Sequence, residues 1–484
     1  MSGVFGQELI HQPSATVVGG QERLTAGARV ISITWREWAE WTGATVQGVS
    51  NLNAHIHRVT IDSRTAGSGD LFVALPGSRV HGHQFVGEAW RAGAVALVEN
   101  GFADWGGPVL RVASPLDAMG TVVRRYVDDH EVRVVGVTGS VGKTSIKELI
   151  AAVLATKYST AATVSNYNTK IGIPLSFFDA SGEVAYFVAE MGMRFAGEIR
   201  RLTEITPPDV AVISNIGPSH LETLGSLDAI SAAKSEILHG LRPEGAAVLN
   251  FDDPRVRYLG NSLKGHRVMW YGETPGLHVS VEQAQLEREH TRIRLRWDQR
   301  AWDIRLPWLG VHQAANVAAA FLVGMAAGVA PEQAIEGLET ISGNRSRIRR
   351  HQVGTLEVLE DDYNASPVSI EAALAVLAAQ AGRRVAVLGD VLELGAEEEA
   401  MHRRIGIKTA SRADVVVTVG SRAQYIAEET AARELPTYST KTIEEAIAVL
   451  TKTLRPGDVV LVKASHGVAL ERLVRQLEEW GGPR

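Results

Sequence analysis

The feature that most constrains this fold is a β-branched run that ends in a glycine-rich turn. Val134-Val-Gly-Val-Thr138 leads into Gly139-Ser-Val-Gly-Lys-Thr-Ser145, which predicts a strand, a turn and a helix. Backbone N–H groups of such a turn converge on a polyphosphate, while the lysine reaches the outer phosphates and the threonine hydroxyl ligates Mg²⁺. The stretch therefore predicts a nucleoside triphosphate site made by Gly139, Ser140, Val141, Gly142, Lys143, Thr144 and Ser145.

The loop departs from the strict phosphate-loop pattern at one position. Glycine is expected five residues before Gly142, where this chain has Val137, with Gly136 and Gly139 on either side. The alternative is a chance Gly-Lys-Thr in an ordinary strand–turn–helix. The strand pattern before the turn and the helical pattern after it favour the phosphate loop.

Length and composition limit the class of protein. The 484 residues predict roughly three domains, and a hydrophobic content of 45% suffices for sizeable cores. A net charge of −6 does not indicate a nucleic-acid or membrane-surface binder, and the absence of cysteine suits a reducing cytoplasm. Residues 1–30 do not resemble a signal peptide, and the apolar run 317–330 is too short for a membrane span and predicts a buried helix.

Alternating strands and helices predict an α/β fold of three domains. Residues 1–30 form an extension expected to be flexible, and residues 31–130 form a small α/β domain with a short helix at 35–41 whose tryptophans pack in the core. Residues 131–344 form a central domain with a mainly parallel sheet, and residues 345–484 form a Rossmann-like domain without a dinucleotide fingerprint. Strands are expected at 58–64, 70–75, 134–138, 186–190, 209–214, 246–250, 384–389, 414–420 and 458–463.

Three polar residues lie at or just beyond predicted strand ends in the central domain. Glu190 ends a strand, His220 follows another, and Lys234 lies on the next helix. Each alone is most simply a solvated charge or a hydrogen-bonded loop residue. Beside a phosphate loop, however, they indicate Mg²⁺ ligation around phosphates, because oxygen ligands suit this hard cation.

Several further motifs are spaced along the chain: Asp62-Ser-Arg64, Gly82-His83, Asn166-Tyr-Asn-Thr-Lys-Ile-Gly-Ile-Pro174, Glu190-Met-Gly-Met193, Gly197-Glu-Ile199, Asn215-Ile-Gly-Pro-Ser-His220, Asp361-Asp-Tyr-Asn-Ala-Ser-Pro367, and Val387-Leu-Gly-Asp-Val-Leu-Glu-Leu-Gly395 with His402. Together with the phosphate loop they resemble the Mur ligase family of cytoplasmic peptidoglycan synthesis. The resemblance extends from about residue 33 to the C-terminus.

The resemblance implies a role for each candidate residue. It assigns Ser63 and Arg64 to the uridine diphosphate, Asn166 and Asn168 to a substrate-facing segment, and His312 and Asn316 to the adenine and ribose. The alternative for Asn316 is a polar residue at a helix N-terminus. Arg345 would reach the γ-phosphate from the third domain, although it lies in a basic cluster that a solvated surface also explains. The reacting centre would include Asp361, Tyr363 and Asn364, with Tyr363 alternatively a core residue.

For the metal site, the resemblance implies Thr144, Glu190, His220 and Lys234 as ligands of Mg²⁺, with two ions expected. The matching lysine of the family is carbamylated, which turns a cation that repels the metal into an anion that binds it. Lys143, Lys234, His220, Arg345 and Asp361 are the expected catalytic residues. Two departures are Lys463-Ala-Ser-His466, in contacts to the incoming dipeptide, and Asp362, which adds an acid expected to lie near the phosphates.

The implied activity is ATP-dependent joining of D-alanyl-D-alanine to a UDP-N-acetylmuramoyl-tripeptide through an acyl phosphate. Its partners would be these small molecules, without nucleic acid or membrane, and the chain would act as a cytoplasmic monomer. A sister ligase that adds a third amino acid, or a folylpolyglutamate synthase-like enzyme, is the nearest alternative, although its Asp-Asn-Pro-Arg and Lys-Gly-His-Glu segments are absent. A non-catalytic ATP-binding protein and a phosphate-loop motor are further alternatives.

Overall fold

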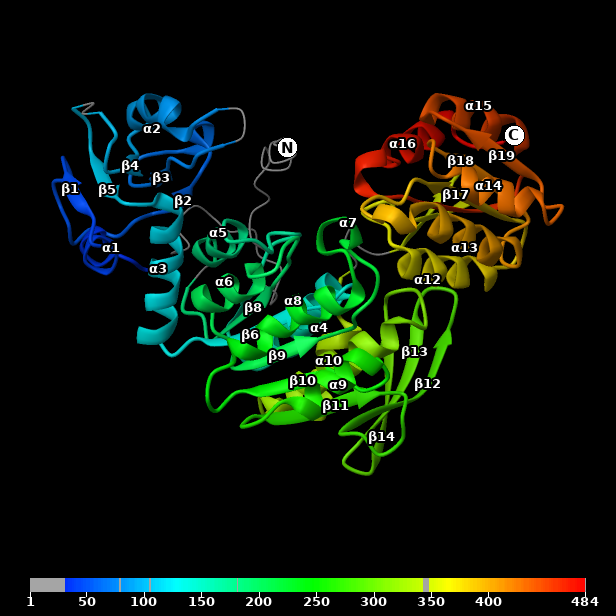
Figure 1. Cartoon of the computed structure of the whole chain (residues 1–484), viewed down its shortest axis with the longest axis horizontal. Coiled ribbons are helices and arrows are strands. Elements are labelled where there is room, and N and C mark those ends of the chain that lie inside the picture. Colours follow the sequence, from blue (N-terminus) through cyan, green and yellow to red (C-terminus); the bar gives the residue numbers. More distant parts are fainter. Residues whose placement is uncertain (1–30, 78–79, 104–105, 181, 343–347, 484) are drawn as a thin grey trace.

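The computed structural model describes residues 31–484 apart from 78–79, 104–105, 181, 343–347 and 484. Its strands form three separate sheets of five, nine and six strands, which follow one another along the chain. The central sheet lies between the other two, which flank it on either side (Figure 1). This arrangement confirms the predicted α/β fold with three parts. The predicted extension 1–30 lies outside the described residues, and the domain boundaries stay predictions.

The first sheet has the strand order β1-β5-β4-β3-β2, and only β1 is antiparallel to its neighbour. The predicted helix at 35–41 is α1, whose N-terminus is capped by reciprocal hydrogen bonds between Thr34 and Glu37. Trp38 is fully buried and its ring lies 5.3 Å from that of Phe178, which confirms a packing role. The elements are α1 (Trp35–Thr42), β1 (Thr45–Gln47), β2 (Val59–Thr60), the 3₁₀ turn η1 (Ser63–Thr65), β3 (Leu71–Val73), η2 (Gly82–Phe85), α2 (Val86–Arg91), β4 (Val95–Glu99), β5 (Val109–Val112) and α3 (Pro115–Asp129).

The central sheet has the order β14-β13-β12-β11-β10-β9-β6-β8-β7, and it is parallel from β7 to β12. The strand that carries the phosphate loop, β6, lies between β9 and β8, so the ends of these three strands meet at one edge. The elements are β6 (Arg133–Thr138), α4 (Lys143–Ala155), β7 (Thr160–Ala162), α5 (Gly172–Phe178), β8 (Tyr186–Glu190), α6 (Glu198–Ile205), β9 (Val210–Ile213), α7 (Leu221–Leu224), α8 (Leu227–His239), β10 (Ala246–Asn250), α9 (Pro254–Ser262), β11 (Arg267–Gly272), β12 (Val279–Leu286), β13 (Thr291–Trp297), β14 (Arg300–Leu306), α10 (Gln313–Ala326) and α11 (Pro331–Glu339).

The two faces of the central sheet belong to different cores. On one face, α4, α10 and α11 pack against the sheet, and α10 is buried over most of its length, which confirms the buried helix predicted around 317–330. On the other face, the core continues into the first domain through α3, which contacts α5 and α6 (Figure 1). The first domain is therefore anchored to the central one by a shared apolar core. Among the described residues, no helix is long and apolar enough to cross a bilayer.

The third sheet has the order β15-β16-β20-β17-β18-β19 and is parallel except for β15. Helices cover both faces, with apolar clusters on each, as expected for a Rossmann-like domain. The elements are β15 (Arg349–Val353), β16 (Leu356–Glu360), α12 (Pro367–Ala378), β17 (Arg384–Gly389), η3 (Gly395–Glu397), α13 (Glu398–Ala410), β18 (Val415–Val419), α14 (Gln424–Ala431), β19 (Thr437–Thr440), α15 (Ile443–Thr453), β20 (Val459–Lys463), η4 (His466–Val468) and α16 (Glu471–Trp480).

Candidate active site

The phosphate loop joins β6 to α4 with a backbone that only glycine tolerates at two positions. Gly139 has φ 149°, and a Cβ there would overlap the hydroxyl of Ser214. Gly142 has φ 88° at the N-cap of α4, and a Cβ there would lie 2.9 Å from Oδ1 of Asn316. Left-handed backbone and close neighbours both exclude a side chain. The loop therefore opens the N-terminus of a buried helix, where backbone N–H groups can receive an anion.

Asn215 braces this loop from the end of the neighbouring strand β9. Its Oδ1 accepts a hydrogen bond from the Val141 N–H, and its Nδ2 donates to the Val141 carbonyl, both at 2.9 Å. The Ser140 hydroxyl donates to the Gly217 carbonyl at 3.0 Å. The motif that begins at Asn215 thus holds the phosphate loop in shape. The sequence indicates a family-like motif there but does not reveal its bracing role, because that role depends on β9 lying beside β6.

Two lysines converge on one carbonyl oxygen of the loop. Lys143 Nζ donates to the Gly139 carbonyl at 3.0 Å, and Lys234 Nζ donates to the same oxygen at 2.9 Å. Burial lowers the pKa of Lys143, and the negative charge of Glu190 opposes this shift. Burial, together with the neighbouring charge of Lys143, lowers the pKa of Lys234 well below its usual value. Lys234, only 2% exposed, is thereby driven towards the neutral amine.

Glu190 gathers the oxygen and amide groups of the candidate metal site. The Thr144 hydroxyl donates to Glu190 Oε2 at 2.8 Å, and the Asn168 amide donates to Oε1 at 2.9 Å. Glu190 ends β8, the direct neighbour of β6, and is 2% exposed. The carboxylate and the hydroxyl are the hard oxygen donors that Mg²⁺ prefers. The structure therefore brings together Thr144, Glu190 and Asn168, while Asn166 is exposed on the same segment.

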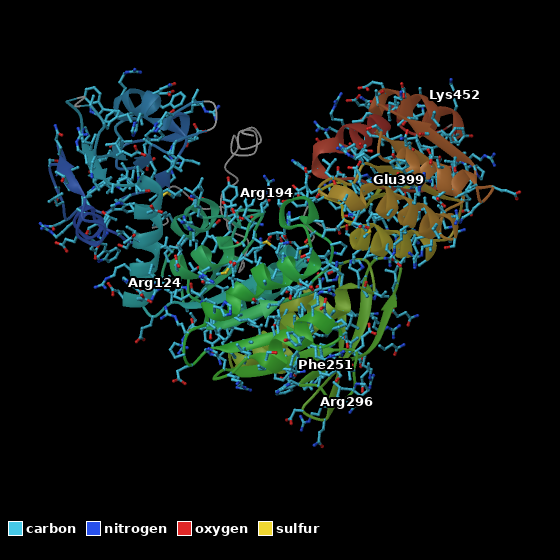
Figure 2. The ribbon with its side chains drawn as sticks, in the orientation of Figure 1. Arg124, Arg194, Phe251, Arg296, Glu399 and Lys452 are labelled. Carbon is cyan, nitrogen blue, oxygen red and sulfur yellow. The ribbon has the colours of Figure 1, made fainter. Side chains whose placement is uncertain are left out.

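His220 faces the C-terminal domain. Its Nδ1 lies 2.8 Å from Oε2 of Glu393, and Arg194 lies 3.8 Å from Oε1 of the same carboxylate. The contact with His220 lowers the pKa of Glu393, so this carboxylate is charged at neutral pH. Arg194 is labelled in Figure 2, and α7, which follows His220, is labelled in Figure 1; both belong to the central domain. Glu393 is not among the predicted site residues, since no local pattern reveals a contact between domains.

The two candidate nucleotide-binding residues at the start of α10, Asn316 and His312, lie at different distances from the phosphate loop. Asn316 is 9% exposed, lies against Gly142, and donates a hydrogen bond to Gln313 Oε1 at 2.8 Å. His312 is the N-cap residue of α10, and its Nε2 lies 3.1 Å from Gln313 Nε2. Asn316 is thus adjacent to the phosphate loop. His312 lies one helical turn away from it along α10.

In the C-terminal domain a buried lysine organises the predicted reacting segment. Lys463, 2% exposed at the end of β20, lies 2.7 Å from Asp361 Oδ2 and donates to the Asn364 carbonyl at 2.8 Å. The rings of Tyr363 and His466 lie 6.2 Å apart, so the altered Lys463-Ala-Ser-His466 segment borders the same loop. His402, in contrast, is fully buried and accepts a hydrogen bond from the Val391 N–H, which is a structural role.

Asp362 lies on the other side of its segment from Asp361. It is 8% exposed, and burial together with the neighbouring Glu360 raises its pKa to about 6. Arg349 pairs with Glu360 and moderates this shift. The extra acid therefore joins Glu360 instead of Lys463, and its carboxyl group is partly protonated at mildly acidic pH. The basic cluster that contains Arg345 is described only in part, because Arg345 itself lies outside the described residues.

The candidate uridine diphosphate residues lie on the turn η1 in the first domain. The Ser63 hydroxyl donates to Glu88 Oε2 at 2.7 Å, and Arg64 pairs with Asp62 at 2.6 Å. The turn η2 also packs on α2, where ligand-type atoms of His81, His83 and Glu99 lie within 4.8 Å of one another. Nδ1 of His81 is already engaged by the His83 N–H at 3.3 Å, however, so packing within the domain accounts for this cluster.

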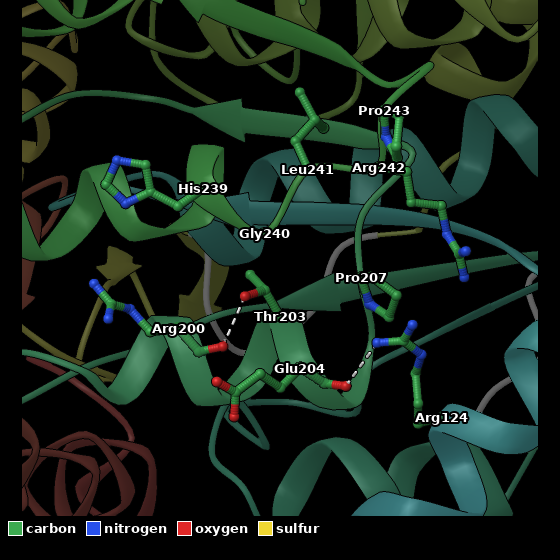
Figure 3. Close-up of a pocket in the computed structure, with 10 residues that line it drawn as sticks. All are labelled: Arg124, Arg200, Thr203, Glu204, Pro207, His239, Gly240, Leu241, Arg242 and Pro243. Carbon is green, nitrogen blue, oxygen red and sulfur yellow. Dashed lines mark hydrogen bonds between the residues drawn. The ribbon is translucent and has the colours of Figure 1, made fainter.

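A cavity of about 490 Å³ lies on the opposite edge of the central sheet (Figure 3). Its wall includes residues that precede β9 and β10, such as Pro207 and Leu241, at the amino ends of these strands. Two of its arginines, Arg124 and Arg242, are each paired with Asp128. Ligands of parallel sheets bind at the carboxyl ends, where the phosphate loop lies, so this cavity is separate from the candidate active site.

Fold and site together define a three-domain α/β protein that binds a nucleoside triphosphate at a phosphate loop. Models of the Mur ligase family catalytic domain, the Mur ligase middle domain and the Mur ligase glutamate ligase domain match residues 55–134, 137–324 and 344–466. The UDP-N-acetylmuramoyl-tripeptide–D-alanyl-D-alanine ligases of Bacillus subtilis and Escherichia coli are each 33% identical and cover 93% of this chain, which covers 99% and 100% of theirs. The chain belongs to the Mur ligase family.

Solved structures extend this likeness to the fold. MurF from Acinetobacter baumannii superposes with a TM-score of 0.86 at 30% identity, over 93% of this chain and 99% of that one. MurF from Thermotoga maritima, solved in complex with ADP, gives a TM-score of 0.78 at 28% identity, over 88% and 97%. A folylpolyglutamate synthase from Mycobacterium tuberculosis shares the fold alone, at 18% identity.

Proposed function

We propose that this chain joins D-alanyl-D-alanine to a UDP-N-acetylmuramoyl-tripeptide with ATP, as a cytoplasmic step of peptidoglycan precursor synthesis. The carrying observation is end-to-end similarity to ligases of that name, at 33% identity over 93% of the chain. The convergence of Lys143, Lys234, Thr144 and Glu190 at the phosphate loop supports it. The products are UDP-N-acetylmuramoyl-pentapeptide, ADP and phosphate.

The reaction proceeds in two displacements. The terminal carboxylate of the tripeptide attacks the γ-phosphorus of ATP, ADP leaves, and an acyl phosphate forms. The amine of the dipeptide then attacks the acyl carbon, and the tetrahedral intermediate loses phosphate and a proton to give the amide. The first step brings an anionic carboxylate to an anionic phosphate, so cationic groups must offset the repulsion.

The residues at the loop supply this compensation. Lys143 lies at the loop with its ammonium group on the Gly139 carbonyl, from which it can turn to the β- and γ-phosphates. Arg345 would reach the γ-phosphate from the C-terminal domain, and His312 and Asn316 would border the adenine and ribose. Asn316 is suited to this role because it lies against Gly142.

Thr144, Glu190 and His220 are the proposed ligands of Mg²⁺, with two ions expected. The oxygens of Thr144 and Glu190 fit this metal because they are hard donors and already meet at 2.8 Å. Bound Mg²⁺ would neutralise phosphate charge and orient the γ-phosphate. Asn168 holds the second carboxylate oxygen of Glu190 and thereby fixes its orientation.

Lys234 would join the metal site as a carbamate. A lysine reacts with CO₂ only as the neutral amine, and burial drives Lys234 towards that form. The amine nitrogen attacks the carbon of CO₂, one carbon–oxygen π bond opens, and one proton leaves, so the neutral amine becomes a carbamate with a single negative charge. Counted from the ammonium, two protons are lost and a positive charge is replaced by a negative one. The nitrogen of Lys234 now donates to the Gly139 carbonyl, the same carbonyl that Lys143 contacts, so the carbamate oxygens would be available to the metal beside the loop.

The remaining groups position the other substrates. Ser63 and Arg64 would hold the uridine diphosphate in the first domain, and Asn166 and Asn168 would face the muramoyl peptide. Asp361, Tyr363 and Asn364 would border the acyl phosphate and the incoming amine when the C-terminal domain approaches. Holding three reactants in line is worth about 7–11 kcal/mol in well-oriented model reactions, so domain closure by a monomer is part of the proposal.

The test is phosphate release by the full chain with ATP and Mg²⁺, with tripeptide and dipeptide supplied together and singly, and with the product weighed by mass spectrometry. Release that needs both substrates and a pentapeptide product is expected. Parallel arms with lysine and with diaminopimelate in the tripeptide identify the preferred third residue. Release with a single amino acid as acceptor would instead indicate a sister ligase, and binding of ATP without any release would indicate a non-catalytic protein.

A further inference from the structure

A carboxylate of the C-terminal domain reaches across to a histidine of the central domain. Glu393 lies between β17 and η3, and its Oε2 lies 2.8 Å from Nδ1 of His220. Its other oxygen lies 3.8 Å from the guanidinium of Arg194. Glu393 therefore links a proposed metal ligand directly to the C-terminal domain.

The backbone on both sides of this contact is shaped for close approach. His220 has φ 58° and Glu393 has φ 64°, a left-handed conformation that non-glycine residues seldom adopt. Gly395 has φ 58°, and a Cβ there would lie 3.1 Å from Cα of Glu222 in α7. The helix α7 projects towards the C-terminal domain and contacts η3 (Figure 1). The pairing of His220 with the half-exposed Glu393 therefore lies beside a close backbone contact between the two domains.

The contact with the Glu393 carboxylate favours one position of the proton on the His220 ring. A bare Nδ1 lone pair at 2.8 Å from a carboxylate would be repelled, so this contact favours the form of the ring with a proton on Nδ1. In the neutral imidazole the lone pair is then on Nε2, which is the nitrogen suited to bind a cation. Histidines that bind metals commonly have a carboxylate beside their other ring nitrogen, and that carboxylate fixes the ring orientation and raises the basicity of the ligand.

We propose that Glu393 is a positioning residue that couples approach of the C-terminal domain to Mg²⁺ binding at the phosphate loop. The inference rests on the proposed function, since it takes His220 as a metal ligand. When the domain approaches, Glu393 orients His220 with Nε2 towards the metal. Because such coupling is reciprocal, bound metal in turn favours the approached position of the domain.

The test compares Glu393→Gln with Glu397→Gln in the full chain. The first substitution keeps the size of the side chain and removes its charge, and Glu397 is an exposed acid in the adjoining turn η3 that serves as the matched control. Mn²⁺ is titrated in the presence of a non-hydrolysable ATP analogue, with free Mn²⁺ followed by electron paramagnetic resonance. We expect Glu393→Gln to weaken Mn²⁺ binding by about 10-fold or more, and Glu397→Gln to bind like the unaltered chain.

Steady-state kinetics supply a second readout. The apparent KM for Mg²⁺ should rise in Glu393→Gln, while kcat at saturating Mg²⁺ stays within about 3-fold, because the residue positions a ligand and touches no reactant. Equal Mn²⁺ affinity in Glu393→Gln and Glu397→Gln would overturn the inference. Tighter binding in Glu393→Gln would also overturn it, because Glu393 would then hold His220 away from the metal.

The experiments distinguish failure of the proposed role of Glu393 from failure of the proposed ligase function. The Mn²⁺ titration contains no peptide substrate, so it remains readable if D-alanyl-D-alanine proves not to be the acceptor. Conversely, ligation of D-alanyl-D-alanine by a Glu393→Gln variant with unaltered Mn²⁺ affinity would overturn only the role of Glu393.

Discussion

Replacing Gly142 by alanine tests whether the shape of the phosphate loop governs nucleotide use. Gly142 has φ 88° at the N-cap of α4, and an added Cβ would lie 2.9 Å from Asn316 Oδ1. Gly197 provides a matched control, because it also has φ 88° at the N-cap of α6, with nothing within 4 Å of an added Cβ. Both variants incur the cost of a left-handed alanine, about 1–2 kcal/mol.

Only Gly142→Ala should also impair ATP use. The new methyl group forces either Asn316 or the loop to shift. The loop N–H groups then no longer point at the phosphate oxygens, and their hydrogen bonds weaken. Loss of one hydrogen bond to a charged group costs about 1.5–3 kcal/mol, and about 1.4 kcal/mol corresponds to a factor of ten. We therefore expect kcat/KM for ATP to fall about 10- to 100-fold in Gly142→Ala and to change little in Gly197→Ala.

Two measurements separate these effects. Urea unfolding of both variants gives the stability loss, which should be similar, and phosphate release at varied ATP gives kcat/KM. Equal values of kcat/KM for the two variants would refute the reasoning, because the contact with Asn316 would then have no bearing on phosphate binding. A much larger stability loss in Gly142→Ala would show that the loop supports the fold as well as the nucleotide.

Three further predictions concern charged groups of the site. Lys143→Ala should lower kcat by about 100-fold or more with an unchanged circular dichroism spectrum, and ATP-dependent turnover near that of the unaltered chain would contradict its role. Added bicarbonate should raise the activity of the unaltered chain in CO₂-depleted buffer, whereas Lys234→Ala should be nearly inactive and indifferent to bicarbonate. Asp362→Asn should raise the free energy of unfolding at pH 7 by roughly 1–3 kcal/mol, because the pKa of Asp362, raised from 3.8 to about 6 in the fold, makes its ionisation costly there. Stability from the protonated acid is present below about pH 4 and is lost as pH rises through 6, so the gain should vanish near pH 4, and a gain independent of pH would be inconsistent with this account.

Much of the fold could be predicted because buried parallel strands are continuous apolar runs. The expected strands at 186–190, 246–250 and 384–389 coincide with β8, β10 and β17. The strands β12, β13 and β14, which pair antiparallel with one another at one side of the central sheet, are not among the expected strands, although Thr291–Trp297 alternates buried and exposed residues. Arginines occupy the exposed positions of β13, and a half-solvated strand of this kind carries too few apolar residues to stand out as a run.

Part of the candidate site could also be predicted from the sequence, and part could not. Thr144, Glu190 and Lys234 could be expected to meet, since the carboxyl ends of neighbouring parallel strands and the helices after them share one edge of the sheet. The contact of His220 with Glu393 could not be expected, because it depends on how two domains are placed. The pairing of Asp362 with Glu360 follows from which side of a short segment each side chain takes, which the order of the residues alone does not reveal.

The charges at the phosphate loop indicate an order of events. With Lys143 and Lys234 both cationic, two positive groups would share the Gly139 carbonyl, and burial opposes this arrangement. Loss of a proton from Lys234 would relieve the repulsion, and the proposed carbamylation would then place an anion beside the ammonium of Lys143. A buried carbamate whose charge is only partly offset by Lys143 would favour Mg²⁺ binding, and bound Mg²⁺ would in turn retain the carbamate. The metal site should accordingly form before, or together with, productive binding of ATP.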